Sequence, residues 1–97
     1  MTLYITRWTR GDMERFPRAV RSRIVQALRA LRDRGEGDTA SLGGGTRRLR
    51  VGDYRIFFGE EGGDVWVLKV MHRRKGYSPE LIDTLIKRLE MLKKGEP

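Results

Sequence analysis

Apolar residues recur along the chain with two different periods, which predict where its strands and helices lie. Residues 3–6 alternate apolar and polar side chains and predict a first strand. Behind Pro17, where a helix can begin without losing a bonded amide, a helically spaced apolar stripe predicts a helix ending near Gly35. This stripe consists of Val20, Ile24, Ala27, Leu28 and Leu31. A short helical turn around residues 12–16 is expected before it, so that the two form a helical hairpin.

The middle of the chain predicts a loop followed by three strands. Residues 35–45 are rich in Gly, Asp, Ser and Thr, which is the composition of a loop. The strands are predicted around residues 48–51, 54–58 and 65–71, with a tight turn at 52–53 and a glycine-containing turn at 60–64. The last strand is apolar on both faces except for Lys69, as expected of a central strand that is covered on both sides.

The C-terminal part of the chain predicts one more helix, over residues 78–95. Ser78, Pro79 and Glu80 supply an N-cap, a first-turn proline and a first-turn acid. Its apolar stripe consists of Leu81, Ile82, Leu85, Leu89 and Leu92, and Gly95 ends it. The resulting order, β-α-α-β-β-β-α, predicts a single α+β domain over residues 1–97. We expect a small antiparallel-rich sheet with helices packed on one face.

Composition limits the chemistry available to the chain. There is no cysteine and only one histidine, so we expect no disulfide, no metal site and no cofactor. No apolar stretch approaches the ~20 residues needed to cross a bilayer, and the first residues lack the layout of a signal peptide. The sequence therefore predicts a cytoplasmic protein with no membrane partner.

The charge of the chain adds a first indication of function. Lys and Arg total 21 against 13 Asp and Glu, which gives a net charge of +8. The excess lies between residues 7 and 77, whereas residues 80–97 are balanced, so it belongs to the body of the domain. Such a charge attracts polyanions through steering and counterion release. We favour a nucleic-acid partner over the alternative of a surface that only keeps the protein soluble.

Strand alternation sorts the arginines of the predicted sheet. Arg48 and Arg50 share one face of their strand, and Arg55 shares a face of the next strand with Phe57. If the apolar sets on these strands face the helices, all three arginines stand on the opposite face. The last strand then leads into a polar segment that contains His72, Arg73, Arg74, Lys75 and Tyr77. This combination predicts a phosphate-binding surface, because guanidinium groups match phosphate oxygens and keep their charge near neutral pH.

The same residues could cleave RNA without a metal. Tyr77 could accept the proton of a 2′-hydroxyl, because neighbouring cations lower the pKa of a phenol. Arg55 could stabilise the charge that develops on the phosphate oxygens, and Arg73 or a protonated His72 could protect the departing 5′-oxygen. Phe57 is the candidate for stacking on a base, because it shares a face with Arg55.

Each of these residues also has a purely structural interpretation. An arginine on a half-exposed strand usually pairs with a nearby carboxylate. A single histidine such as His72 at a strand end is often held by a structural hydrogen bond, and Tyr77 could pack beside the helix cap. Trp8 and Trp66 are expected in the core or at its rim. The set as a whole is more specific than its members.

Two stretches of the chain resemble toxins of the RelE/ParE superfamily, which belong to type II toxin–antitoxin systems. Residues 42–58 (LGGGTRRLRVGDYRIFF) are similar to the middle of these toxins, and residues 67–77 (VLKVMHRRKGY) are similar to their closing strand and catalytic end. The specific parts are the RLRVGDYRI run and the His-Arg pair with a Tyr five residues after the His. The order of elements is similar over nearly the whole chain.

The resemblance implies a ribosome-dependent endoribonuclease that cuts messenger RNA and is inhibited by a cognate antitoxin. Arg55 would match the transition-state arginine, Arg73 the arginine at the leaving group and Tyr77 the general base. His72 would match the histidine that precedes this arginine in many members. The basic residues Arg48, Arg50, Arg74 and Lys75 are candidates for binding RNA, with the first two matching the pair that orients the message. The implied partners are the antitoxin, the ribosome with bound message, and operator DNA only through the antitoxin complex.

The sequence departs from the RelE pattern in two places and leaves alternatives open. Met71 stands before the histidine, where members commonly have glycine, and a helix follows Tyr77, where most RelE-branch chains end. That helix could cover the antitoxin groove or the active site. The ParE branch shares the fold but inhibits DNA gyrase and has no nuclease site; a degenerate member that only binds its antitoxin is a third possibility. The spacing of Tyr77 favours the RelE branch. The oligomeric state stays open.

Overall fold

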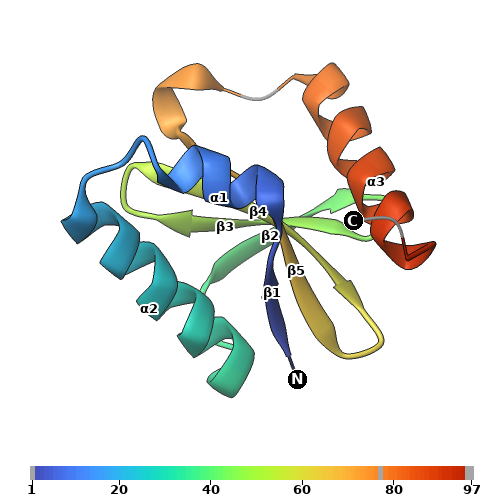
Figure 1. Cartoon of the computed structure of the whole chain (residues 1–97), viewed down its shortest axis with the longest axis horizontal. Helices are drawn as coiled ribbons and strands as arrows, with labels where there is room; N and C mark the ends of the chain where they lie inside the picture. Colours follow the sequence, from blue (N-terminus) through green and yellow to red (C-terminus); the bar gives the residue numbers. More distant parts are fainter. Residues whose placement is uncertain (1, 77, 96–97) are drawn as a thin grey trace.

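A computed structural model describes residues 2–76 and 78–95, and its elements form one five-stranded sheet with three helices (Figure 1). The strands are β1 (Leu3–Ile5), β2 (Asp38–Gly43), β3 (Thr46–Val51), β4 (Tyr54–Glu61) and β5 (Asp64–His72). The helices are α1 (Arg7–Met13), α2 (Arg18–Arg34) and α3 (Pro79–Lys93), with a 3₁₀ turn, η1 (Arg73–Lys75), before α3. The sheet order is β1-β5-β4-β3-β2, in which β1 runs parallel to β5 and the other neighbours are antiparallel.

The predicted α+β class and antiparallel-rich sheet are confirmed, and so are the signals at the ends of the long helices. Pro17 precedes α2 as its N-cap residue, and Gly35 ends it in the left-handed conformation at φ 65°. Ser78 caps α3 by accepting a hydrogen bond from the backbone N–H of Leu81, with Pro79 in the first turn. The apolar stripes therefore face the core as predicted, with Ile24, Leu28 and Leu31 of α2 buried. No helix in the described part of the chain is long and apolar enough to cross a membrane.

Two elements differ from the predicted order. The region 35–45 is not a loop throughout, because β2 occupies residues 38–43 and pairs along β3, so four strands follow α2 where three were predicted. Backbone pairing imposes this strand in spite of a turn-like composition, since β-propensity depends on context. The first helix spans Arg7–Met13 and only overlaps the turn predicted at 12–16. Thr6 begins it by accepting a hydrogen bond from the Thr9 N–H.

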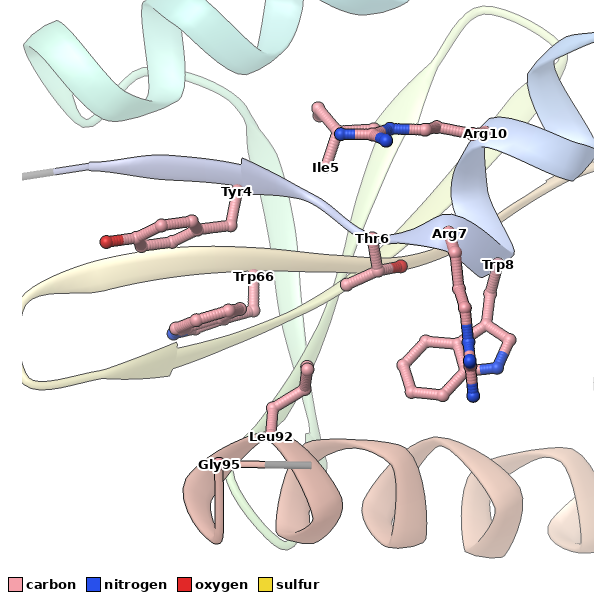
Figure 2. A pocket seen from close by; sticks show the side chains of 9 residues that line it. All are labelled: Tyr4, Ile5, Thr6, Arg7, Trp8, Arg10, Trp66, Leu92 and Gly95. Carbon is pink, nitrogen blue, oxygen red and sulfur yellow. The ribbon is translucent and has the colours of Figure 1, made fainter. Parts of the chain in front are cut away.

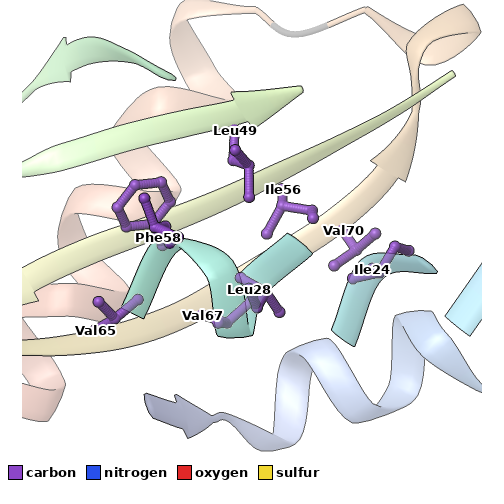
Figure 3. Close-up of a cluster of buried hydrophobic side chains, with 9 residues drawn as sticks. Ile24, Leu28, Leu49, Ile56, Phe58, Val65, Val67 and Val70 are labelled. Carbon is purple, nitrogen blue, oxygen red and sulfur yellow. The ribbon is translucent and has the colours of Figure 1, made fainter. Parts of the chain in front are cut away.

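Helices cover both faces of the sheet, which corrects the prediction that they pack on one. On one face α2 packs over a core that includes Leu49, Ile56 and Phe58 (Figure 3). On the other face Leu85 and Leu89 of α3 pack over a second cluster, formed by Phe57, Leu68 and Met71. The physical reason is that β4 and β5 are apolar on both sides, so each face has to be shielded from water.

Glycines allow α3 to lie directly on the sheet. A Cβ atom added to Gly59 of β4 would come within 2.6 Å of Leu89 Cδ1, and one added to Gly44 would come within 2.7 Å of Ile86 Cδ1. Gly44 also has φ +60°, a conformation that other residues rarely adopt. The glycine run between β2 and β3 is thus the turn that receives the last helix.

Side chains of Thr6 and helix α1 form hydrogen bonds with the backbone of β5 beyond the point where β1 ends. The hydroxyls of Thr6 and Thr9 donate to the Val67 carbonyl at 2.7 and 2.9 Å. One turn further along α1, a carboxylate oxygen of Asp12 accepts the Val70 N–H at 3.0 Å. These side chains take the place of a ladder partner, so β5 is an interior strand along its length.

Candidate functional site

The three arginines of the predicted surface share one face of the sheet. In the β3–β4 ladder Arg50 lies opposite Arg55, and Arg48 lies opposite Phe57. Since side chains directly opposite one another point to the same side, the prediction from strand alternation is confirmed for this group. The face is the one that α3 covers, because Phe57 belongs to the cluster under that helix. The arginines therefore border a helix and do not stand on an open sheet.

The local environments of these arginines differ. Arg50 is exposed and pairs with Asp38, with 3.7 Å between Nη1 and Oδ2. Arg55 is half-buried, and its Nη1 donates to the carbonyl oxygens of Gly52 and Tyr54, both at 3.0 Å. Arg48 is also half-buried, and its Nε is shielded from solvent with no hydrogen-bond partner among the described residues. Arg55 is thus the arginine that backbone contacts hold in place.

Three predicted catalytic residues meet at a small cavity where β5 ends. Arg55, His72 and Arg73 line a cavity of about 240 Å³ together with Met71 and Gly76. Arg55 and Met71 are partners in the β4–β5 ladder, and Met71 is 7% exposed. The bulky side chain of Met71 therefore leaves the space beside Arg55 open.

A contact between two turns positions Arg73. Its backbone N–H donates to the Asp53 carbonyl at 2.7 Å, and its Nε lies 3.2 Å from Asp53 Oδ1. Asp53 belongs to the β3–β4 turn, so this contact ties η1 to that turn. Both side chains are more than half exposed, and an exposed ion pair contributes little stability. A phosphate can therefore replace Asp53 as the partner of Arg73 at small cost.

His72 has a structural role in addition to its place at the cavity. Its Nδ1 accepts the Arg74 N–H at 3.1 Å, which caps η1, and its ring lies edge-on to Tyr54 at 5.2 Å between centroids. With Nδ1 acting as an acceptor, Nε2 is the nitrogen that carries the proton. The structural interpretation of His72 thus coexists with a position where Nε2 can donate to a ligand.

The other candidates fall into three groups. Arg74 and Lys75 are exposed on η1, where an RNA backbone can reach them. Phe57 is 0% exposed beneath α3, so its predicted role as a stacking surface is corrected: the helix that covers it was expected on the other face. Tyr77 lies outside the described residues, and its role as general base stays a prediction.

Sequence reasoning missed the polar residues that hold α3 to the sheet. Arg88 of α3 donates from Nη1 to the Leu68 carbonyl at 3.0 Å, and its guanidinium lies 4.9 Å from the ring centroid of Trp8. Burial lowers the pKa of Arg88, and the negative charge of Asp12 partly offsets this. Asp12 also pairs with Lys69 at 3.6 Å. A lone arginine beside the apolar stripe of α3 was the only sequence signal. Among the described residues no group of three or more His, Cys, Asp or Glu side chains could hold a metal.

Comparison with known proteins identifies the family. A sequence model for the ParE toxin of the type II toxin–antitoxin system parDE matches residues 2–77. The chain belongs to this toxin family. It is therefore a toxin of the RelE/ParE superfamily, as the two sequence stretches indicated, while no curated protein matches it.

Solved structures of toxin–antitoxin complexes share the fold of this toxin. The RelB–RelE complex from Methanococcus jannaschii matches with a TM-score of 0.63 and 22% identity, over 74% of this chain and 92% of that chain. The RelBE2 complex from Mycobacterium tuberculosis matches with a TM-score of 0.62 and 25% identity, over 74% of this chain and 96% of that chain. The RelE–RelB complex from Pyrococcus horikoshii OT3 matches with a TM-score of 0.62 and 22% identity, over 79% of this chain and 97% of that chain. The matching family model is thus named for ParE, whereas these structural relatives are RelE toxins.

Proposed function

We propose that this toxin is a metal-independent endoribonuclease that cuts messenger RNA on the ribosome. The observation that carries the proposal is the cavity at the end of β5, where Arg55, His72 and Arg73 come together from two strands and a turn. Three groups with these chemistries, beside a space of about 240 Å³, suit a phosphodiester whose charge increases during reaction.

In the proposed cleavage each group has one role, and Tyr77, which lies outside the described residues, is assigned the role of base from the sequence. The 2′-oxygen of the message attacks the adjacent phosphorus as its proton passes to the phenolate form of Tyr77, and the bond from phosphorus to the 5′-oxygen breaks. The products are a 5′-hydroxyl and a 2′,3′-cyclic phosphate or its hydrolysis product. Arg55, which two carbonyls hold at 3.0 Å, stabilises the negative charge on the phosphate oxygens. Arg73 leaves Asp53 to neutralise the departing 5′-oxygen, His72 donates a hydrogen bond to it from Nε2, and the oxygen takes its proton from water.

Basic residues around the cavity bind the rest of the RNA. Arg48 and Arg50 lie on the same face as Arg55, and Arg74 and Lys75 continue the positive charge along η1. Their contacts with phosphates orient the message and the ribosomal RNA, which provides affinity without sequence preference. The structural relatives are complexes with RelB antitoxins, which supports a cognate antitoxin as the partner that inhibits this toxin. Operator DNA is reached only through that complex.

The second candidate function is inhibition of DNA gyrase by surface binding, without nuclease activity. The family model that matches the chain is that of ParE, and this match favours the candidate. Under this alternative, the cavity residues would be dispensable for toxicity.

Primer extension in a purified translation system separates the two candidates. We expect wild-type toxin to cut a defined message inside ribosome-occupied codons, and to leave it uncut without ribosomes. Arg55→Gln and Tyr77→Phe should abolish the cuts because they remove the charge-stabilising group and the base. Arg29→Gln on α2, an exposed position with the same change in charge, is the matched control and should keep cutting.

An uncut message with normal translation would contradict the nuclease proposal. Gyrase supercoiling would then be measured with the same variants. Inhibition that Arg55→Gln and Tyr77→Phe leave unchanged would establish the ParE-like function instead.

A further inference from the structure

A second cavity, of about 460 Å³, lies at the C-terminal end of α3 and shares no lining residue with the Arg55 cavity (Figure 2). Its walls come from β1, the start of α1, β5 and the last turn of α3. Tyr4, Trp66, Trp8 and Leu92 provide its apolar surface, and Arg7 and Arg10 stand at its border. None of these side chains takes part in the proposed cleavage.

A stacked aromatic pair forms one wall of this cavity. The parallel ladder places Tyr4 of β1 beside Trp66 of β5, and their rings stack with centroids 4.0 Å apart and planes 13° from parallel. Tyr4 is 38% exposed, and Trp66 is half-buried. Because Tyr4 fixes the indole in one orientation, a ligand that stacks on Trp66 does not have to order the ring first.

The arrangement around Trp66 suits a flat ligand. Figure 2 shows the indole between Tyr4 on one side and Leu92 of α3 on the other, with the Trp8 ring further along the same cavity. A planar ring that enters between Trp66 and Leu92 contacts an aromatic face and an aliphatic side chain. This geometry favours an aromatic ligand over a bulky branched one.

The charge at the border selects among aromatic ligands. Arg7 and Arg10 are exposed, and no ion pair between described residues engages either of them. The Arg7 guanidinium lies 5.5 Å from the Trp8 ring centroid, so its charge is at the mouth of the apolar cavity. The whole chain carries +8. A ligand that combines a flat ring with a negative charge meets both requirements, and a nucleotide has this composition.

We propose that this cavity binds an unpaired base of a single-stranded nucleic acid, with the base stacked on Trp66 and its phosphate near Arg7 and Arg10. The site adds an RNA contact outside the cleavage cavity, and it depends on neither the ribosome nor the cleavage reaction. The prediction that both tryptophans belong to the core or its rim is confirmed, because both are half-buried and pack against the α3 cluster. Trp66 also lines this cavity, where a base can reach it.

Binding of a non-cleavable oligonucleotide tests the proposal. The probe is a 2′-O-methyl RNA hexamer, which lacks the hydroxyl needed for cleavage, and its comparison is an abasic hexamer of the same charge. Fluorescence anisotropy gives both affinities, and quenching of tryptophan emission reports stacking. We expect the base-containing hexamer to bind about 10-fold more tightly than the abasic one, the usual effect of stacking one base.

Variants locate the effect. Trp66→Leu should reduce the affinity ratio of the two hexamers to about 1, whereas Trp66→Phe should keep part of it. Tyr4→Leu, at an exposed position, should lower the ratio even if Trp66→Leu does not fold. Arg29→Gln, far along the chain on α2, is the matched control and should weaken both hexamers equally.

Two kinds of result, one in the binding assay and one in the oligomeric state, would overturn the proposal. One is equal binding of both hexamers by the wild type, or a ratio that Trp66→Leu leaves unchanged. The other is a dimer in size-exclusion chromatography that Trp66→Leu converts to monomer with no preference for bases, which would make the cavity an interface between two copies. Neither result affects the primer-extension test, because that test depends on Arg55 and Tyr77.

Discussion

The two faces of the sheet differ in what they contain. The face under α2 carries one apolar cluster of nine buried residues, which come from α2 and from strands of the sheet, and no charged side chain is among them. The face under α3 has five such residues, and around them lie Arg48, Arg55 and the aromatic cavity of Trp66. The α2 face therefore has the larger apolar core, with Arg47 half-buried at its border, whereas the α3 face combines a smaller core with Arg48, Arg55 and two cavities.

This difference indicates that one face of the sheet mainly stabilises the fold, whereas the other carries the residues of the candidate site. A sheet of this size exposes two faces, and the cluster on one of them contains nine of the fourteen buried hydrophobic residues in the described part of the chain. The other face can then tolerate half-buried arginines and open spaces, each of which costs stability. We expect substitutions on the α2 face to change folding and substitutions at the border of the α3 face to change activity.

The largest effect is expected from Leu28→Ala on the α2 face. Leu28 is 1% exposed in the larger cluster, so its truncation should cost about 2–5 kcal/mol of the free energy of unfolding. Urea denaturation measures this loss. The exposed neighbour Gln26, changed to Ala, should shift stability by less than about 0.5 kcal/mol. A loss below about 1 kcal/mol for Leu28→Ala would contradict the assignment of stability to this face.

Gly59→Ala tests the close approach of α3 to the other face. The added Cβ would lie 2.6 Å from Leu89, so the helix has to shift, at a cost of about 1–3 kcal/mol. Hydrogen exchange should become faster in α3 and stay unchanged in α2. Gly11→Ala is the control: nothing lies within 4 Å of its added Cβ, and it sits inside α1, so stability should rise by about 0.5–1 kcal/mol.

Thr6→Val tests the hydrogen bonds that hold the start of α1 to the edge of β5. The substitution removes the N-cap of α1 and the hydrogen bond to the Val67 carbonyl, and we expect a loss of about 1 kcal/mol. Thermal unfolding measures the change. The exposed Thr2, changed to Val, serves as a comparison. Equal stability of Thr6→Val and wild type would mean that α1 is held by its apolar contacts alone.

The smallest change in stability is expected from Arg73→Gln at the site. Arg73 and Asp53 are 60% and 58% exposed, so their ion pair should contribute less than about 0.5 kcal/mol. Loss of toxicity in a growth assay with unchanged urea denaturation would separate the site from the core. If the Arg73→Gln variant unfolds at a lower urea concentration, Arg73 contributes to the stability of the fold. If the variant remains fully toxic, Arg73 is not needed for activity. Either result would contradict the proposed role of Arg73.

Local signals made much of the fold predictable. The period of the apolar residues placed α2 and α3, and Ser78 marked the start of α3, because these features depend on neighbours within a turn or two. The strand β2 and the start of α1 were missed. The start of α1 is held by the carbonyl of Val67, which is distant in sequence, whereas β2 is held by pairing with the neighbouring β3 in spite of its turn-like composition.

The candidate site shows the same division. Alternation along β3 and β4 was enough to place Arg48, Arg50 and Arg55 together, since it needs only the pleat of each strand and the turn between them. The burial of Phe57 was not predictable, because it depends on which face α3 covers. The contact of Arg73 with Asp53 likewise requires η1 to fold back onto the β3–β4 turn.

The sequence by itself therefore determined the class of fold, the family and the grouping of the arginines, because periodicity, caps and motifs act over a few residues. The tertiary structure decided which groups share a cavity. Arg55 meets Arg73, and Tyr4 stacks on Trp66, only after the strands pair in one register. Register is a long-range property, since a shift of one residue would move every side chain of a strand to the other face.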